Sequence, residues 1–415
     1  MATTQTSGAR HAVLAGFLGW TLDAFDFFVI VFLYDILARQ FGVPKRDIIF
    51  TTTATLAMRP VGALLFGVLA DRYGRRIPLM ANVIYFSLIE LLCGFSPNYT
   101  FFLVMRALFG IGMGGEWGVG ASLAMEAAPL RWRGVLSGIL QSGYSIGYLL
   151  AALAARFLLP APFLQPNWGW RAMFWAGALP ALLALYIRMK VPESEAWKQH
   201  RVASTREVLK VVAREWKRFA YLVVLMTFMM FLSHGTQDLY PDFLQEVHKI
   251  STATRANIAI VYNIGAVCGA ILFGHLSQKI GRRRGMLAAM SLCLVMIPLW
   301  AFGHGLGVLI LSSFLMQMGV QGAWGVIPVH LSELSADAAR GLMPGLSYQL
   351  GILLASPTNT IQYALRDVVG YQWAIAGFEI VSIITLAIIL LSGKEAHGRS
   401  FVRVSQPEAN SIKTR

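Results

Sequence analysis

The most distinctive group of polar side chains in this 415-residue chain lies in an otherwise apolar stretch, Phe231-Leu-Ser-His-Gly-Thr-Gln-Asp-Leu-Tyr-Pro241. In a helix, His234 and Asp238 stand four residues apart on one face, which Gln237 shares. Histidine is the side chain that most readily takes up and releases a proton near neutral pH. Ionisable groups within an apolar span are costly and usually face a cavity or each other. The pattern therefore indicates a polar pathway rather than a packed core.

A second group of charges lies nearer the N-terminus, where Asp23 and Asp26 are three residues apart. Two carboxylates this close in a medium of low dielectric repel unless one is protonated or a cation lies nearby. The pair suits a proton site, although a solvated vestibule would also accommodate it. Glu116 is a further acid in an apolar stretch, and Arg59 and Arg106 are the two arginines that fall well inside such stretches, away from their ends.

The elements that must position these groups follow from composition. The chain is 56% hydrophobic and 13% charged, with a mean hydropathy of +0.59, whereas soluble domains carry about 25% charged residues. Twelve apolar stretches are long enough to cross a bilayer as helices. They cover residues 12–37, 48–70, 77–95, 99–126, 134–158, 170–189, 220–245, 255–277, 285–303, 307–330, 341–365 and 370–392. The fold class predicted is an all-α membrane protein with twelve transmembrane helices.

The net charge of +14 follows this topology. With the N-terminus inside, 25 of the 35 Lys and Arg fall on the cytoplasmic side and eight on the opposite side. Cytoplasmic loops are enriched in Lys and Arg, so both termini are expected in the cytoplasm. The protein is expected in the inner membrane of the cell. The basic residues do not indicate nucleic-acid binding.

The chain repeats itself at an offset of 207 residues. Gly67–Arg76 aligns with Gly274–Arg283, and Glu126 aligns with Glu333. Duplicated halves with a site at their interface are typical of secondary transporters. We predict an N-terminal six-helix bundle at 1–190, a cytoplasmic linker at 191–219, a C-terminal six-helix bundle at 220–393 and a cytoplasmic tail at 394–415.

These repeats carry a resemblance to the major facilitator superfamily. Gly67–Arg76 resembles the family signature between helices 2 and 3, Arg106–Gly112 its helix-4 motif, and Val191–Ser194 the segment after helix 6. The resemblance implies two pseudo-symmetric bundles that expose a central site to either side of the membrane in turn. Asp71 of the signature is placed to pair with arginines and helix termini and so latch the halves together. The predicted latch residues are Asp71, Arg72, Arg75, Glu126, Arg133, Glu333 and Arg340. In the second copy Gln278 replaces the Asp, which weakens the case for a C-terminal latch.

Ser233–Asp238 resembles the helix-7 signature of fungal lactate permeases in the sialate:proton symporter family. Gly19–Phe28 and Tyr348–Gly351 resemble the first and eleventh helices of that family. The resemblance implies proton-coupled symport of a monocarboxylate such as lactate or pyruvate. Asp242 stands where those permeases tend to have Thr, which leaves the exact substrate open.

A carboxylate substrate requires a cationic partner, preferably a bidentate one. The candidate substrate contacts are Arg59, Arg106, His234, Gln237, Gln349 and Tyr144, and the candidate proton-coupling residues are Asp23, Asp26, Glu116 and Asp238. The 207-residue offset carries Asp26 to Ser233, so His234 and Asp238 are expected to face the span-1 acids across the interface. No cofactor or metal is expected, because the proton gradient supplies the driving force, and the chain is expected to act as a monomer.

Other interpretations stay open. A symporter of sialic acid, 2-oxo acids or aromatic acids would share the scaffold. A drug:proton antiporter is disfavoured because Gly138–Gly143 lacks the Gly-Pro hinge of that group. A nontransporting membrane sensor would be expected to carry an extra signalling domain. Enzyme activity is not expected, because neither a nucleophile–base pair nor a metal-ligand spacing occurs.

Overall fold

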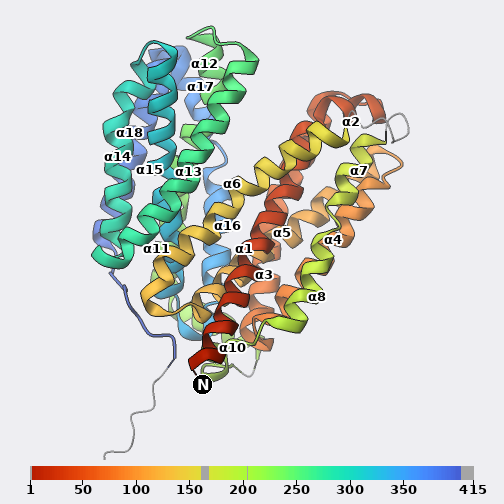
Figure 1. The fold of residues 1–415 in the computed structure, drawn as a ribbon, viewed down its shortest axis with the longest axis vertical. Coiled ribbons are helices and arrows are strands. Elements are labelled where there is room, and N and C mark those ends of the chain that lie inside the picture. Colours follow the sequence, from red (N-terminus) through yellow and green to blue (C-terminus); the bar gives the residue numbers. More distant parts are fainter. Residues whose placement is uncertain (1, 160–167, 203, 403–415) are drawn as a thin grey trace, which may run out of the picture.

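The computed structural model describes residues 2–159, 168–202 and 204–402, and every regular element in these ranges is a helix (Figure 1). The first half contains α1 (Ala2–Val29), η1 (Ile30–Phe32), α2 (Tyr34–Phe41), α3 (Lys45–Tyr73), α4 (Arg76–Gly94), α5 (Tyr99–Ala127), η2 (Leu130–Trp132), α6 (Arg133–Leu158), α7 (Gly169–Ala176) and α8 (Pro180–Lys190). Two short helices follow, α9 (Glu195–Gln199) and α10 (Thr205–Arg214). The second half contains α11 (Trp216–Gln237), α12 (Tyr240–Glu246), α13 (Thr252–Ile280), α14 (Arg282–Phe302), α15 (Leu306–Leu334), η3 (Asp337–Ala339), α16 (Met343–Ala355), α17 (Thr358–Val369) and α18 (Tyr371–Ser392).

Within the described ranges, ten helical segments are long and apolar enough to cross a membrane. The other two predicted spans are helical as well. α5 runs for 29 residues, and its hydropathy is lowered by Arg106, Glu116 and several glycines. The span predicted at 341–365 is divided at Ser356 and Pro357 into α16 and α17. Pro357 has no N–H to donate to the preceding turn, and its ψ of 5° departs from helical geometry. These helices are the twelve spans of the predicted fold class.

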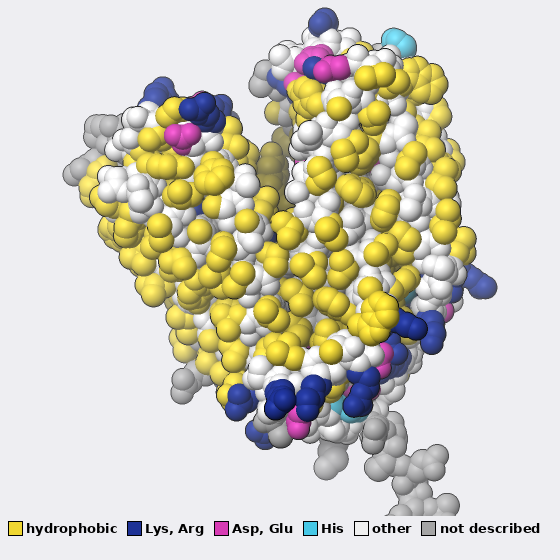
Figure 2. All heavy atoms as spheres, turned by 180° about the vertical axis from the view of Figure 1, so that it is seen from behind, with side chains coloured by type: hydrophobic (Ala, Val, Ile, Leu, Met, Phe, Trp, Pro, Cys, Tyr) yellow, Lys and Arg dark blue, Asp and Glu magenta, His cyan; other side chains and the backbone are white. Residues whose placement is uncertain are grey.

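The two halves touch at one end of the molecule and diverge toward the other (Figure 1). Across the interface α6 packs against α13 and α15, and α16 packs against α3 and α5. We call the end beside the N-terminus and α10 the closed end, and the end bearing α2, α7, α12 and α17 the open end. In Figure 2 hydrophobic side chains cover the flanks, Lys and Arg gather at the closed end, and a hollow separates the halves at the open end.

Glycines let the two halves approach backbone to backbone. A Cβ added to Gly118 of α5 would lie 2.7 Å from Gly345 Cα of α16. Gly138 of α6 likewise presses against the carbonyl of Ala270 on α13. Small residues at helix contacts allow such packing in membranes.

The predicted domain boundaries stay predictions, although α10 falls inside the predicted linker at 191–219 and α11 begins within its last residues. Residues 403–415 of the predicted tail lie outside the described residues.

Candidate functional site

An aromatic platform lies where the halves meet. Trp20 of α1 stacks on Tyr144 of α6 with ring centroids 5.5 Å apart. Trp117 of α5 stacks on Tyr348 of α16 at 4.5 Å, and Trp324 of α15 meets the Tyr348 ring edge-on at 5.7 Å. Helices of both halves thus share one set of rings, so movement of either half must disturb it. Tyr144, a predicted substrate contact, belongs to this platform.

Arg59 of α3 lies over the platform. Its guanidinium carbon is 5.6 Å from the Tyr348 ring centroid, and the residue is only 4% exposed. Nε and Nη2 find no hydrogen-bond partner among the described residues. The charge of Arg59 acts on both Asp23 and His234, so it links the two clusters singled out in the sequence. α3 continues as a helix through Pro60. A buried guanidinium with unused donors is suited to bind a carboxylate.

Arg106 is placed differently. It is fully buried in α5, and its Nη1 lies 3.1 Å from Glu90 Oε2 of α4. Its guanidinium carbon is 4.5 Å from the Phe109 ring centroid. Its Nε and Nη2 also lack a hydrogen-bond partner among the described residues, but unlike Arg59 it is paired with a carboxylate, Glu90, which offsets its charge. Its role as a substrate contact stays a prediction.

His234 and Asp238 form the pair that their spacing indicates. His234 Nδ1 is 3.1 Å from Asp238 Oδ2, and their side chains are 38% and 34% exposed. Asn359 of α17 donates to the same Asp238 oxygen at 3.1 Å. Gln237 instead donates to Gln317 of α15 at 2.7 Å, so its side chain is held by the interior of the second half.

The acids of the first half lie deeper. Asp23, Asp26 and Glu116 are fully buried, and none of their carboxylate oxygens has a hydrogen-bond partner in the described ranges. Asp26 Oδ1 would lie 2.5 Å from a Cβ added to Gly177, which follows α7, and Glu90 Cγ would be equally close. Glu116 abuts Gly19 of α1 in the same way.

The expectation that Asp26 faces His234 and Asp238 across the interface is therefore wrong. Asp26 is turned into the first half, beside Glu90 and α7, and the charges that act on it are those of Glu90, Asp23 and Arg106. Arg59 is the group that reaches both sides.

Gln349 of α16 is 1% exposed, and neither its amide oxygen nor its nitrogen has a partner among the residues described. A buried amide without partners is costly, so a ligand or water that satisfies it would be stabilised here. Its role as a substrate contact stays a prediction.

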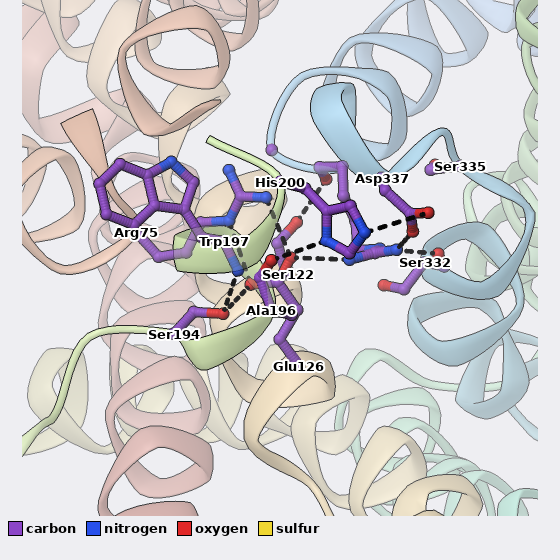
Figure 3. Close-up of polar contacts among 12 residues, drawn as sticks. Arg75, Ser122, Glu126, Ser194, Ala196, Trp197, His200, Ser332, Ser335 and Asp337 are labelled. Atoms are coloured by element: carbon purple, nitrogen blue, oxygen red, sulfur yellow. Dashed lines mark hydrogen bonds and ion pairs between the residues drawn. The ribbon is translucent and has the colours of Figure 1, made fainter. Parts of the chain in front are cut away.

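The N-terminal copy of the latch (Asp71, Arg75, Glu126, Arg340) joins the halves at the closed end. Asp71 Oδ1 accepts from Gly341 N at 2.7 Å and from Arg75 Nη1 at 2.5 Å, and its Oδ2 accepts from Leu342 N at 3.0 Å. Glu126 pairs with Arg75 at 2.9 Å and with Arg340 of the other half at 3.3 Å. Figure 3 shows Arg75, Glu126 and Ser194 converging, with Ser194 Oγ 2.5 Å from Glu126 Oε2.

A C-terminal copy (Gln278, Arg282, Glu333, Arg133) repeats this arrangement. Gln278 Oε1 accepts from Gly134 N and from Arg282 Nη2, both at 3.1 Å. Arg282 pairs with Glu333 at 2.9 Å, and Arg133 of the first half approaches Glu333 at 3.6 Å. The sequence had left a C-terminal latch in doubt, because a glutamine replaces the aspartate. In the structure Gln278 still accepts hydrogen bonds as the carboxylate would, but it supplies no charge.

Arg72 is not directed at the second half. It donates to Thr205 of α10 at 3.3 Å, and its guanidinium carbon lies 4.7 Å from the Tyr73 ring centroid. It therefore holds the linker helix against α3. Its membership of the latch stays a prediction.

Two segments that the sequence did not assign to the latch contribute to it. The indole of Trp197 donates to the Asp71 carbonyl at 2.7 Å. His200 reaches Asp337 at 3.8 Å (Figure 3). Near the C-terminus, the Phe401 ring centroid lies 4.0 Å from the guanidinium carbons of both Arg133 and Arg340. Phe401 is 2% exposed, so this segment caps an arginine from each half. The only sequence signal was one aromatic residue in a polar tail.

The chain was compared with known proteins. The model of a family described as "Sugar (and other) transporter" matches residues 11–218 and 218–396. The "Carboxylic acid transporter protein homolog" of Saccharomyces cerevisiae is 30% identical over 380 residues, which cover 85% of this chain and 60% of the yeast protein. The chain thus spans 60% of that relative's length. The "Sialic acid transporter NanX" of Escherichia coli is 28% identical over 345 residues, covering 82% of this chain and 84% of the relative.

Among solved structures, the proton:xylose symporter XylE with bound 6-bromo-6-deoxy-D-glucose superposes with a TM-score of 0.76 at 18% identity. The match covers 96% of this chain and 98% of XylE. At this identity the likeness shows the fold alone. Together with the family match it leads to one conclusion. The chain belongs to the sugar (and other) transporter family, and it is a multi-pass membrane transporter of the major facilitator fold, not an enzyme.

Proposed function

We propose that this chain carries out proton-coupled symport of a small carboxylate, of the lactate or pyruvate kind, by alternating access. The observation that carries the proposal is Arg59, a buried guanidinium with two unused nitrogens above an aromatic platform at the meeting of the halves. Arg106 is the other arginine predicted inside a span, and Glu90 already pairs with it. An anionic substrate would satisfy the free donors of Arg59 and cover the Tyr348 ring.

The acids of the first half support coupling to protons. Asp23, Asp26, Glu90 and Glu116 are fully buried there with two arginines, Arg59 and Arg106. Two positive charges can offset two of the four carboxylates. An ionised and unpaired carboxylate inside a membrane protein is costly, so the remaining two are most stable when they hold protons. A substrate anion at Arg59 would compete with Asp23 for the same cation and so favour protonation of Asp23.

His234 and Asp238 provide a route for those protons. The side chains of the pair are partly exposed, and the charge of Arg59 acts on His234. A proton entering from the open end can reside on this pair before it reaches the buried acids. Substrate anion and proton would then cross together, and the loaded carrier would move little net charge.

The names of the relatives support a carboxylate as the substrate and widen the range of acids to consider. One is named for carboxylic acids and one for sialic acid. The second candidate function is therefore symport of a larger hydroxylated acid such as sialic acid. Its supporting observation is the polar wall of His234, Asp238 and Asn359, which could bind hydroxyl groups.

Uptake into proteoliposomes tests the proposal. Labelled lactate, pyruvate and sialate are supplied with and without an inward proton gradient, to wild type, Arg59→Gln, Arg59→Lys and Arg366→Gln. Removing a cation paired with a desolvated anion costs about 2–5 kcal/mol, or roughly thirtyfold or more in affinity. Arg59→Gln should lose binding, and Arg59→Lys should recover part of it. Arg366→Gln removes an arginine that is paired with Glu246 at the open end, and it should match wild type. Wild-type affinity in Arg59→Gln would mean that the carboxylate is held elsewhere.

A second experiment separates coupling from binding. Asp238→Asn and Asp26→Asn should lose proton-driven accumulation while counterflow exchange survives, because exchange requires no net proton movement. His234→Ala should change affinity and the pH profile together. Substrate-induced alkalinisation outside cells is the readout. Wild-type proton uptake in all three variants would exclude these residues from coupling.

We further propose that the closed end faces the cytoplasm, because Lys and Arg gather there (Figure 2). Fusion of a reporter to the C-terminus tests this orientation. Green fluorescent protein should fluoresce and alkaline phosphatase should stay inactive. The reverse result would mean that the closed end faces away from the cytoplasm and that the open cavity faces it.

A further inference from the structure

A lateral groove on the membrane-facing side of the first half has no role in the transport site. It measures about 550 Å³ and lies between the start of α1 and the turn that leads into α6. Its lining comes from Ala9, Arg10, Val13, Leu14, Phe17, Pro129, Arg131, Trp132, Leu136 and Ile139. The lining is thus apolar apart from two arginines and one tryptophan.

The two arginines differ from those of the latch at the same end. Arg10 and Arg131 are exposed, and neither forms a hydrogen bond or ion pair among the residues that the structure describes. Arg75 and Arg282, at the same end, each pair with a glutamate. Segments 121 residues apart in the sequence therefore bring two positive charges to one groove without a counter-ion.

The apolar part of the groove is exposed on two helical segments that are long and apolar enough to cross a membrane. Leu14, 43% exposed, lies in the segment Gly8–Phe32, and Trp132, 49% exposed, lies in the segment Leu130–Leu158. Tryptophan is enriched at the level of the lipid headgroups, and Arg10 and Arg131 flank the same groove. An apolar groove whose lining also includes a tryptophan and two cations without a counter-ion complements an acyl chain joined to an anionic phosphate.

We propose that this groove binds one anionic phospholipid, with its phosphate between Arg10 and Arg131 and an acyl chain along Val13, Phe17 and Ile139. Basic pockets on membrane proteins attract such headgroups, and each buried methylene of the chain adds to the binding. The lipid would contact the turn η2, which leads directly into Arg133 of the C-terminal copy of the latch. The proposal is independent of the transported substrate.

Native mass spectrometry of the full-length protein in detergent tests it. Dioleoylphosphatidylglycerol, dioleoylphosphatidylcholine and glycerol 3-phosphate are titrated separately against wild type and variants. Binding of the first phosphatidylglycerol should exceed that of phosphatidylcholine by about thirtyfold, the value expected for two basic residues near a membrane surface. Arg10→Gln/Arg131→Gln should remove this preference. Arg206→Gln/Lys210→Gln, which removes two exposed charges from α10 at the same end, should keep it.

Ala9→Phe provides an independent variant, because it fills the groove and leaves both arginines in place. It should weaken binding of either phospholipid, while its thermal unfolding midpoint shows that the fold is intact. The proposal is overturned if the double Arg variant keeps its preference, or if the α10 control loses it equally. It is also overturned if glycerol 3-phosphate binds as tightly as phosphatidylglycerol, since the site would then recognise phosphate without a lipid chain.

Discussion

Asp71 offers the sharpest test of how the closed end is held shut. Its carboxylate accepts from the backbone nitrogens of Gly341 and Leu342 across the interface at 2.7 and 3.0 Å, and from Arg75 at 2.5 Å. In Asp71→Asn one oxygen remains as an acceptor and an NH₂ group replaces the other. That group must point at a backbone N–H or at Arg75, so donor faces donor.

The size of the effect follows from these contacts. A hydrogen bond to a charged acceptor contributes about 1.5–3 kcal/mol, and a buried donor left without a partner costs about 1–3 kcal/mol. Losing one such bond and leaving one donor unpaired destabilises the latched conformation by about 3 kcal/mol, roughly a hundredfold in the ratio of conformations. Because the change weakens a contact between the halves and spares the core of each, folding should persist while net transport slows.

Distances between spin labels at the open end measure this ratio. Gln40→Cys on α2 and Gln245→Cys on α12 place exposed labels on opposite halves, in a background where the exposed Cys268 is replaced by serine. Wild type should show mainly the long distance of the open cavity, and Asp71→Asn should add a shorter one as the halves rock.

Gln278→Ala is the matched control for Asp71→Asn. It removes a neutral side-chain acceptor from the Gly134 backbone and from Arg282, a change of about 1 kcal/mol or roughly fivefold. If the distance distribution of Asp71→Asn superposes on that of wild type, the carboxylate does not hold the halves, and the reasoning from its three contacts fails.

Three further results are expected. Phe401→Ala should shift the same distance distribution by about fivefold or more, because two cation–π contacts of about 0.5–2 kcal/mol each are lost, while Phe401→Trp should stay near wild type. Gly177→Ala should lower the thermal unfolding midpoint, because its Cβ would crowd Asp26 Oδ1 at 2.5 Å. In Gly377→Ala of α18 the added Cβ would meet nothing within 4 Å beyond the backbone of its own helix, so the midpoint should stay unchanged or rise. Burial, and then the charge of His304, lower the pKa of His248 in a loop at the open end. Below about pH 6.5 the unfolded chain therefore binds more protons at this residue than the folded protein does. The free energy of unfolding should fall as pH drops through that value. His248→Gln should remove this slope, and unchanged pH dependence in that variant would assign it to other groups.

The sequence predicted the parts of this molecule that are set by local pattern. Apolar length located all twelve spans, and the 207-residue offset identified Glu126 and Glu333 as equivalent positions of the repeat. Both glutamates pair with arginines at the closed end. Spacing also predicted the His234–Asp238 contact, because residues four apart in a helix must be neighbours.

The direction in which a helix turns its charges could not be predicted in this way. Asp23 and Asp26 share a face, but that face can be turned toward the cavity or into the bundle without any change in the sequence of α1. The choice depends on Gly177, more than 150 residues away, which leaves room for Asp26 beside Glu90. Only the packed tertiary structure shows that the space exists.

The latch shows how a repeat limits prediction in a different way. The offset placed Gln278 at the position equivalent to Asp71 and left a C-terminal latch in doubt, since an amide carries no charge. In the structure both residues accept from the backbone nitrogen of a glycine in the opposite half, Gly134 for one and Gly341 for the other. A carbonyl oxygen is sufficient for that bond, so the geometry survives, whereas the charge-assisted strength is kept only in the N-terminal copy. The N-terminal copy should therefore resist opening more strongly than the C-terminal copy. Phe401, whose ring lies against an arginine from each half, adds a contact between the halves that neither repeat encodes.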